Sequence, residues 1–296
     1  MTAGPPSRWR VDFSLVAISI IWGSTFVLVK QALDDISTLL FLTLRFTIAV
    51  AALAIILRKG LRGQALFGAS VRGGLVAGLC LFSGYVLQTF GLKYTTPAKA
   101  GFLTGLYIPL VPLFSLAINR KTPLISELLG IAAAALGMAL MTVQDGSMSI
   151  GIGDLLVIAC AVAYAFHILA LGRFAKSSSV AVLTITQIGV CAALGGISFW
   201  WAERPQIRWS ASVWLALSIT SLLATALVFY LQTWAQQYSS PSRTALIFSL
   251  EPVFAWLASF LITGEILSRR GVFGAAFILF GILLVELKPL TIKQHQ

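Results

Sequence analysis

Ten long apolar segments follow one another along the chain, with only short polar breaks between them. A helix that crosses the hydrocarbon core of a bilayer needs about 20 such residues. Charged residues make up 10% of the chain, whereas an ordinary soluble domain carries about 25%. The sequence therefore predicts an all-α integral membrane protein with ten transmembrane helices. The expected spans are 13–30, 37–57, 74–92, 98–119, 124–143, 153–173, 180–201, 212–236, 243–263 and 271–287.

The low polarity excludes several classes of protein. A soluble enzyme needs more polar surface to cover its core, and disordered or disulfide-stapled chains have other compositions. The net charge of +11 comes from Lys and Arg in short loops, so we expect no nucleic-acid partner. Cys80, Cys160 and Cys191 lie in apolar stretches and are interpreted as packing residues. Two histidines are too few for a zinc or haem site, so no cofactor is expected.

The distribution of Lys and Arg predicts the orientation of the chain in the membrane. With the N-terminus inside, 13 basic residues fall on the inner side and 7 on the outer side. Because cytoplasmic loops carry the excess of Lys and Arg, we expect both termini in the cytoplasm. The first apolar run is too long for a signal-peptide core, so it is interpreted as a retained span.

An internal repeat appears when the sequence is shifted so that position 231 lies over position 87. Residues 87–97 then lie over 231–241 with five identities among 11 positions. Each half, 1–148 and 149–296, holds five expected spans, and an odd number inverts the second half relative to the first. Inverted repeats are typical of secondary transporters, whose substrates bind near the midplane between the halves. The alternative is a duplication that only produced a stable bundle.

Short motifs in both halves resemble those of a known family. They are Trp-Gly-Ser-Thr-Phe at 22–26, Leu-Glu-Pro-Val-Phe at 250–254, Gly-Glu at 264–265, and the late glycines Gly130 and Gly274. The ordered set resembles the EamA branch of the drug/metabolite transporter superfamily, and in size and plan the aromatic amino-acid exporters within it. The resemblance implies a bacterial inner-membrane exporter of amino acids or other small metabolites.

The first half departs from this pattern. Ile108 stands near the position equivalent to Glu251, and the region 119–121 replaces the Gly-Glu pair. A site that depends on these acids is therefore expected to be asymmetric.

Polar residues in the middle of a span need a partner or a cavity. Gln88 and Gln232 are related by the repeat, and Tyr85 and Phe229 lie one turn earlier on the same helix faces. These four residues are candidates to line a pocket for an amphipathic solute. The alternative is that the two amides form hydrogen bonds between helices.

Arg45 is a basic residue deep within a span. It could hold a substrate carboxylate in a bidentate fork. It could equally pair with Glu251 or with backbone carbonyls, or extend towards lipid headgroups. The family resemblance implies a buried arginine opposite Gln187 of the other half, and both residues are substrate-binding candidates.

Glu251 directly precedes Pro252, and a proline within a helix produces a kink. A carboxylate in the membrane is desolvated, which favours its protonated form, so Glu251 is the candidate for proton coupling. The alternative is a neutral or ion-paired residue that stabilises the kink. Pro109, Pro112 and Pro252 are the candidate gating hinges.

Aromatic residues and a histidine gather in three spans. Trp22, Tyr164 and His167 are further substrate-binding candidates, because the resemblance places the first and sixth helices near the cavity. Tyr107, in the fourth span, is a candidate as well, since aromatic rings suit a flat or apolar solute. The alternatives are lipid contact and core packing.

Together these features predict a secondary transporter that works by alternating access. The expected partners are a small-molecule substrate and the lipid bilayer, and the chain is expected to act as a monomer. The alternatives are a passive facilitator and an exporter of a nucleobase, sugar or drug. No Walker motif and no catalytic constellation is present in the sequence, so an ATP-driven pump and an enzyme are not expected.

Overall fold

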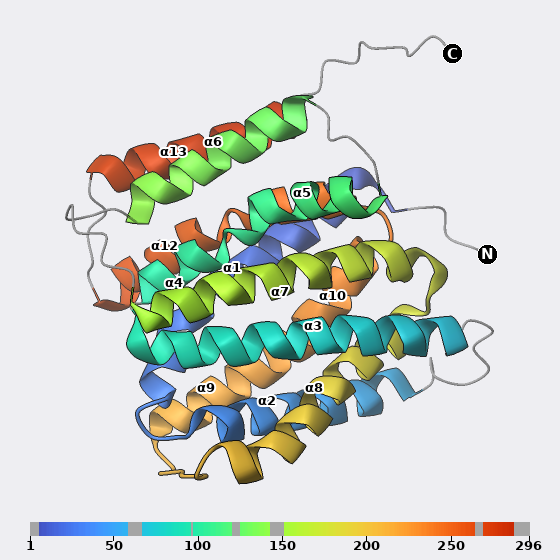
Figure 1. Cartoon of the computed structure of the whole chain (residues 1–296), viewed down its shortest axis with the longest axis vertical. Coiled ribbons are helices and arrows are strands. Elements are labelled where there is room, and N and C mark those ends of the chain that lie inside the picture. Colours follow the sequence, from blue (N-terminus) through green and yellow to red (C-terminus); the bar gives the residue numbers. More distant parts are fainter. Residues whose placement is uncertain are drawn as a thin grey trace.

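The computed structural model describes residues 6–58, 67–95, 97–119, 125–142, 151–263 and 269–286. These residues form helices and connecting turns, with one antiparallel bridge between Ile36 and Ile207 (Figure 1). The elements are α1 (Arg8–Ala32), α2 (Thr38–Leu57), α3 (Phe67–Tyr94), α4 (Pro97–Thr104), α5 (Tyr107–Asn119), α6 (Ile125–Thr142), α7 (Ile152–Phe174), η2 (Ala175–Ser177), α8 (Val180–Ala202), α9 (Ala211–Ser221), η3 (Leu222–Leu227), α10 (Val228–Ala235), α11 (Pro241–Phe248), α12 (Glu251–Thr263) and α13 (Arg269–Glu286).

Seven segments of the described chain are long and apolar enough to cross a membrane. The chain is therefore a multi-pass membrane protein. The remaining expected spans, at 124–143, 243–263 and 271–287, correspond to the shorter helices α6, α11 with α12, and α13. The seven segments are Arg8–Ala32, Thr38–Leu57, Gly68–Tyr94, Ala100–Ile118, Ile152–Ser177, Val180–Ala202 and Ala211–Ala235.

The fold is duplicated, and three helices of each half have bounds that repeat at one offset. Helices α4, α5 and α6 of the first half recur as α11, α12 and α13, and both ends of each helix are displaced by the offset of the sequence repeat. Helix α3 recurs as the combined segment α9–η3–α10, which begins at the same offset. Helices α6 and α13 lie side by side at one edge of the molecule (Figure 1), so the repeat-related helices there contact each other.

Two expected spans are broken rather than continuous. The segment 98–119 divides into α4 and α5, and the segment 243–263 divides into α11 and α12. The expectation of a proline kink inside a continuous helix is therefore wrong for Pro252. This residue is the second of α12, where the missing N–H is not needed. Pro109 likewise lies in the first turn of α5, whereas Pro112 is inside that helix.

The span that follows α8 changes its helical pitch in the middle. Between α9 and α10 the six residues of η3 form a π-helical turn, in which hydrogen bonds run from residue i to i−5. The N–H of Val228 accordingly reaches the carbonyl of Leu223. The repeat-related helix α3 continues without such a turn, so the two halves differ at this level.

Connecting segments are tied together at one end of the helices. The backbone N–H of Arg208 donates to the carbonyl of Asp35 at 2.7 Å, and their side chains form an ion pair. The Ser210 hydroxyl and the Arg208 guanidinium beside Asp35 hold the pKa of that carboxyl below its ordinary value. Glu203 accepts hydrogen bonds from the first two amides of α2, at 2.9 and 2.6 Å. The segment before α2 is therefore fixed to the segment after α8.

Gly23 allows α1 to approach the start of α12 closely. A Cβ atom at this position would lie 2.7 Å from the backbone oxygen of Glu251 and 2.8 Å from the nitrogen of Ala255. Both neighbours are backbone atoms, so a side chain cannot be accommodated by a rotamer change. The glycine of the Trp-Gly-Ser-Thr-Phe motif is thus needed where the two halves meet.

We predict that Gly23→Ala destabilises the protein by about 1–3 kcal/mol, because the added methyl group forces α1 away from α12. The measurement is thermal unfolding of the purified protein in detergent. Gly196→Ala in α8 is the matched control, since nothing lies within 4 Å of its Cβ position. Equal unfolding temperatures for the two variants would contradict this account of the packing.

Candidate functional site

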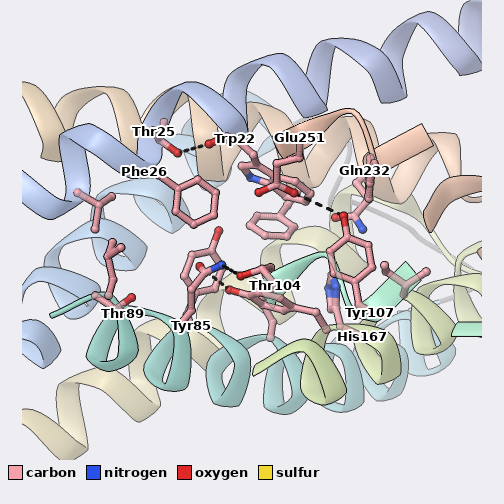
Figure 2. Close-up of a pocket in the computed structure, with 18 of the residues that line it drawn as sticks. Trp22, Thr25, Phe26, Tyr85, Thr89, Thr104, Tyr107, His167, Gln232 and Glu251 are labelled. Atoms are coloured by element: carbon pink, nitrogen blue, oxygen red, sulfur yellow. Dashed lines mark hydrogen bonds between the residues drawn. The ribbon is translucent and has the colours of Figure 1, made fainter. Parts of the chain in front are cut away.

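A pocket lies at the centre of the helices, with an empty volume of about 690 Å³ that includes its opening (Figure 2). Its walls come from α1, α2, α3, α4 and α5 of the first half and from α7, α10, α11 and α12 of the second. The lining residues are Trp22, Thr25, Phe26, Val29, Arg45, Leu81, Tyr85, Gln88, Thr89, Leu92, Thr104, Tyr107, Tyr164, His167, Ile168, Phe229, Gln232, Phe248 and Glu251.

Most of the residues proposed from the sequence come together here. Every substrate-binding candidate except Gln187 lines the pocket, and so does Glu251. The candidate hinges Pro109, Pro112 and Pro252 are not among the lining residues. The lining residues that the sequence analysis missed include Thr25, Phe26, Thr104 and Phe248.

Some of the lining residues that were not proposed could have been found from their spacing along the sequence. Thr25, Phe26 and Val29 follow Trp22 by three, four and seven residues, so they share its helix face. Thr104 and Phe248 are the last residues of α4 and α11. Their exposure to the pocket depends on the helix breaks, which the sequence analysis did not predict.

Arg45 is 4% exposed and is held by neutral groups. Its Nε donates to the Thr225 hydroxyl at 2.8 Å, and its Nη2 donates to the Tyr85 hydroxyl at 2.9 Å. The guanidinium carbon also lies 4.5 Å from the centre of the Tyr85 ring, a cation–π distance. Of the alternatives for Arg45, pairing with a backbone carbonyl is present, to Ala224. Within the described chain no hydrogen bond or ion pair joins Arg45 to Gln187 or Glu251.

The π-helical turn supplies a further acceptor. The carbonyl of Ala224, within η3, accepts a hydrogen bond from Arg45 Nη2 at 3.3 Å and one from Trp22 Nε1 at 3.0 Å. Both donors belong to the first half and the acceptor to the second. A π turn changes which backbone carbonyls are bonded within the helix, and this carbonyl fixes two pocket residues.

Gln187 lies behind the pocket wall and not in it. Its side-chain oxygen is 2.9 Å from His167 Nε2, and its Nε2 donates to the Thr233 hydroxyl at 3.1 Å. All three side chains are buried. Gln187 therefore positions the imidazole that lines the pocket and connects α8 to α7 and α10.

The repeat-related glutamines have different surroundings. Gln88 accepts from the Tyr164 hydroxyl at 3.0 Å and donates to the Thr104 hydroxyl at 3.0 Å, so it connects α3, α7 and α4. Gln232 donates from Nε2 to Gln236 at 3.2 Å. Its Oε1 is buried and has no hydrogen-bond partner within the described chain. The two interpretations of these amides, pocket lining and helix bonding, both hold for Gln88.

Tyr107 and Glu251 meet where the two broken spans resume. Each is the first residue of its helix, α5 or α12, and the offset between them is that of the sequence repeat. The structure thus makes Tyr107 the counterpart of Glu251, and the expected placement of Ile108 near that position is off by one residue. The Tyr107 hydroxyl donates to Glu251 Oε2 at 3.4 Å (Figure 2). A carboxylate in the first turn of a helix is favoured by the helix dipole.

Aromatic rings form much of the remaining wall. The Trp22 ring lies 5.5 Å from that of Phe229 and 5.2 Å from that of Phe248. Tyr85 is 5.8 Å from Tyr164 in an edge-on arrangement. These distances are in the range of favourable aromatic contacts, so the pocket joins flat apolar surfaces to a few polar groups. Among the described residues, no group of three His, Cys, Asp or Glu side chains gathers as a metal site.

The fold and the pocket define a duplicated, multi-pass helical membrane protein with a central cavity between its halves. The sequence pattern of the EamA-like transporter family matches residues 9–143 and 151–287. The chain belongs to this family, and it is a membrane transporter.

Proteins that are similar to this chain are described as transporters. An uncharacterized transporter of Archaeoglobus fulgidus is 33% identical over 281 residues, which cover 95% of this chain and 87% of that protein. The uncharacterized transporter YyaM of Bacillus subtilis is 26% identical and covers 93% and 92%. The uncharacterized inner membrane transporter YedA of Escherichia coli is 23% identical over 93% and 90%. A solved crystal structure superposes with a TM-score of 0.78 at 22% identity, covering 95% and 98%, which shows the same fold.

We predict that Arg45→Gln lowers the free energy of unfolding by about 1–3 kcal/mol, because buried acceptors lose a charged donor. Thermal unfolding in detergent measures the effect. Arg72→Gln is the matched control, since it makes the same change at an exposed position of α3. A stability equal to that of the control would show that the hydrogen bonds of Arg45 do not hold the centre together.

Proposed function

We propose that the chain is a secondary transporter that exports small metabolites, foremost amino acids with aromatic or neutral side chains, by alternating access between two inverted five-helix repeats. The observation that carries the proposal is the central pocket, to which both halves contribute aromatic and polar side chains. A cavity of this kind at a repeat interface is where secondary transporters bind their substrates.

The direction of the helices supports the inverted arrangement. Lys30, in the last turn of α1, donates to the carbonyl of Thr95 at 3.3 Å. The hydroxyl of the same threonine donates at 2.7 Å to Asp154, in the first turn of α7. Helices α1 and α7 are repeat counterparts, yet one ends where the other begins. They therefore run in opposite directions.

Helices α4 and α11 are also repeat counterparts, and they begin at opposite ends of α1. Helix α4 follows Thr95, which Lys30 contacts, whereas α11 begins beside Asp12. Asp12, near the start of α1, accepts hydrogen bonds at 3.1 and 2.7 Å from Arg243 in the first turn of α11. Inverted halves can exchange conformations, and the exchange turns an inward-open cavity into an outward-open one. The proposed hinges are three prolines. Pro109 and Pro252 lie in the first turns after the helix breaks, and Pro112 lies inside α5.

The chemistry of the walls supports an amphipathic substrate. Flat rings from Trp22, Tyr85, Tyr164 and Phe229 suit an aromatic or apolar body. Glu251 is the acid that lines the pocket, and we propose it as the residue that couples transport to protons. The partners are a small-molecule substrate and the lipid bilayer, without nucleic acid, and the chain acts as a monomer in the inner membrane.

The transport assay uses purified protein in liposomes and labelled phenylalanine, tryptophan, leucine and uracil. We expect saturable counterflow of the amino acids. Gln88→Ala and Gln232→Ala should each reduce it by about tenfold, the equivalent of one lost hydrogen bond of about 1.4 kcal/mol. Gln31→Ala, at an exposed position of α1, is the matched control, and gel filtration checks the fold of every variant.

Three outcomes decide between the parts of the proposal. If uracil shows counterflow and the amino acids do not, the substrate belongs to another chemical class than the one proposed. Full activity of both glutamine variants would remove those residues from the site. Accumulation driven by a pH gradient in the wild type, but not in Glu251→Gln, is the result expected for proton coupling, and its absence in the wild type would contradict it.

The excess of Lys and Arg favours both termini in the cytoplasm, and this orientation is also tested directly. A green fluorescent protein fused to the C-terminus should fluoresce in a bacterial host, whereas an alkaline phosphatase fused there should be inactive. The reverse pattern would overturn the proposed orientation.

A further inference from the structure

One end of the pocket offers hydrogen-bond acceptors that the protein does not fill. The side chain of Gln232 is 1% exposed, and its Oε1 has no donor within the described chain. Its Nε2 is already bonded to Gln236, so the amide is held in one orientation. A buried acceptor without a donor is costly, and a ligand N–H group at this position would remove the cost.

Glu251 adds an acidic side chain at the same end, and its two oxygens are acceptors when it is ionised. Figure 2 shows Glu251, Tyr107 and Gln232 grouped at one side of the pocket. The one hydrogen bond described for the Glu251 carboxylate comes from Tyr107 to Oε2, and at 3.4 Å it is long. The side chain is buried and lines the pocket. Among the described residues no Lys or Arg forms an ion pair with it.

Arg45, the cation of the pocket, is in the opposite situation. Its guanidinium donates to Thr225, Tyr85 and the carbonyl of Ala224. These contacts fasten α2 to α3 and to the π-helical turn, so the charge is already surrounded by protein acceptors. A ligand anion would compete with them. The unfilled polar groups of the pocket are therefore acceptors, and a ligand that supplies a hydrogen-bond donor and a positive charge is the complementary one.

The aromatic wall fits the same kind of ligand. Trp22 packs against Phe229 and Phe248, and its indole N–H is bonded to Ala224, which fixes the plane of the ring. The faces of such rings attract ammonium groups and pack against apolar bodies. Trp22 and Glu251 line the same pocket, and Gly23, the residue after Trp22, packs against the backbone oxygen of Glu251. An ammonium held by the carboxylate therefore shares the pocket with this aromatic wall.

We propose that Glu251, Gln232 and Tyr107 form a subsite for the ammonium group of the ligand, and that the substrates are amines with an aromatic or apolar body. This inference rests on the proposed transport function and deepens it. The ammonium is the polar group that the pocket recognises, and a carboxylate on the substrate is dispensable. Amino acids are bound through their amino group, and amines without a carboxylate are bound equally well.

The test compares three ligands that share a phenyl ring and differ in their polar groups. Phenethylamine carries only the ammonium, phenylalanine carries both groups, and 3-phenylpropionate carries only the carboxylate. Binding to the purified full-length protein is measured by ligand-dependent thermal stabilisation, which reports Kd by mass action. We expect both amines to bind at least about thirtyfold more tightly than the acid, since loss of one partner of a buried charge pair has an effect of this size.

Two acid-to-amide variants assign the effect to the subsite. Glu251→Gln keeps the shape of the side chain and should abolish the preference for amines. Asp34→Asn, at an exposed position between α1 and α2, is the matched control and should keep it. The fold of Glu251→Gln is checked by gel filtration and by its unfolding temperature without ligand. A preference that survives in a folded Glu251→Gln protein overturns the proposal.

The remaining outcomes separate this inference from the transport function. Equal or tighter binding of 3-phenylpropionate to the wild type overturns the ammonium subsite. If phenylalanine counterflow is observed at the same time, the transport function stands. Binding of both amines with the expected preference, but without counterflow of either, supports the subsite and contradicts transport of these ligands. No binding of either amine overturns the subsite.

Discussion

The charge of Arg45 is the constraint on which the centre of this molecule depends, because a guanidinium at membrane depth is stable only where protein atoms replace water. Thr225, Tyr85 and the carbonyl of Ala224 do so. Two of these acceptors belong to the π-helical turn of the second half. The same carbonyl holds the indole of Trp22, so the group that satisfies the arginine also places the largest aromatic side chain of the pocket.

The two broken spans show how a duplicated fold acquired an asymmetric site. The breaks fall in the same register in each half, and the residues beside them differ in chemistry: Tyr107 against Glu251, and Thr104 against Phe248. Gln88 is bonded on both of its polar atoms, whereas its counterpart Gln232 keeps a buried oxygen without a donor in the described chain. Unfilled acceptors therefore lie at one end of the pocket, and a ligand with a single cationic group has one preferred orientation.

The spans and the repeat could be predicted because both depend on apolar length and spacing along the sequence. The pocket residues were predictable for a related reason, since polar and aromatic side chains in the middle of a span need a cavity or a partner. The helix breaks were not predicted. Pro252 suggested a kink inside a helix, whereas it starts one, and a proline is compatible with either position.

The π-helical turn and the place of Gln187 could not have been predicted from local sequence. Nothing in the composition of Leu222–Leu227 favours a π turn, and its contacts are with Arg45 and Trp22, which belong to the other half of the chain. Gln187 was expected to bind substrate, but it lies outside the pocket lining and bonds to His167, which lines the pocket. Which of several buried polar groups pair with one another depends on how the helices cross, and span length and spacing do not determine the crossings.

The burial of the charged contacts also bears on how the two halves can move. Separating Arg45 from the π-helical turn would leave a cation unsolvated within the membrane, which is costly. The Arg243–Asp12 and Lys93–Glu203 ion pairs lie near helix ends and are partly exposed, with side-chain exposures of 14% and 24%, and of 31% and 14%. Water can replace these partners at small cost. Relative motion of the halves is therefore easier at the Asp12 end of α1 than at the centre. At the opposite end the bonds of Asp35 and Glu203 also hold the two halves together, because they join the segment before α2 to the segment after α8.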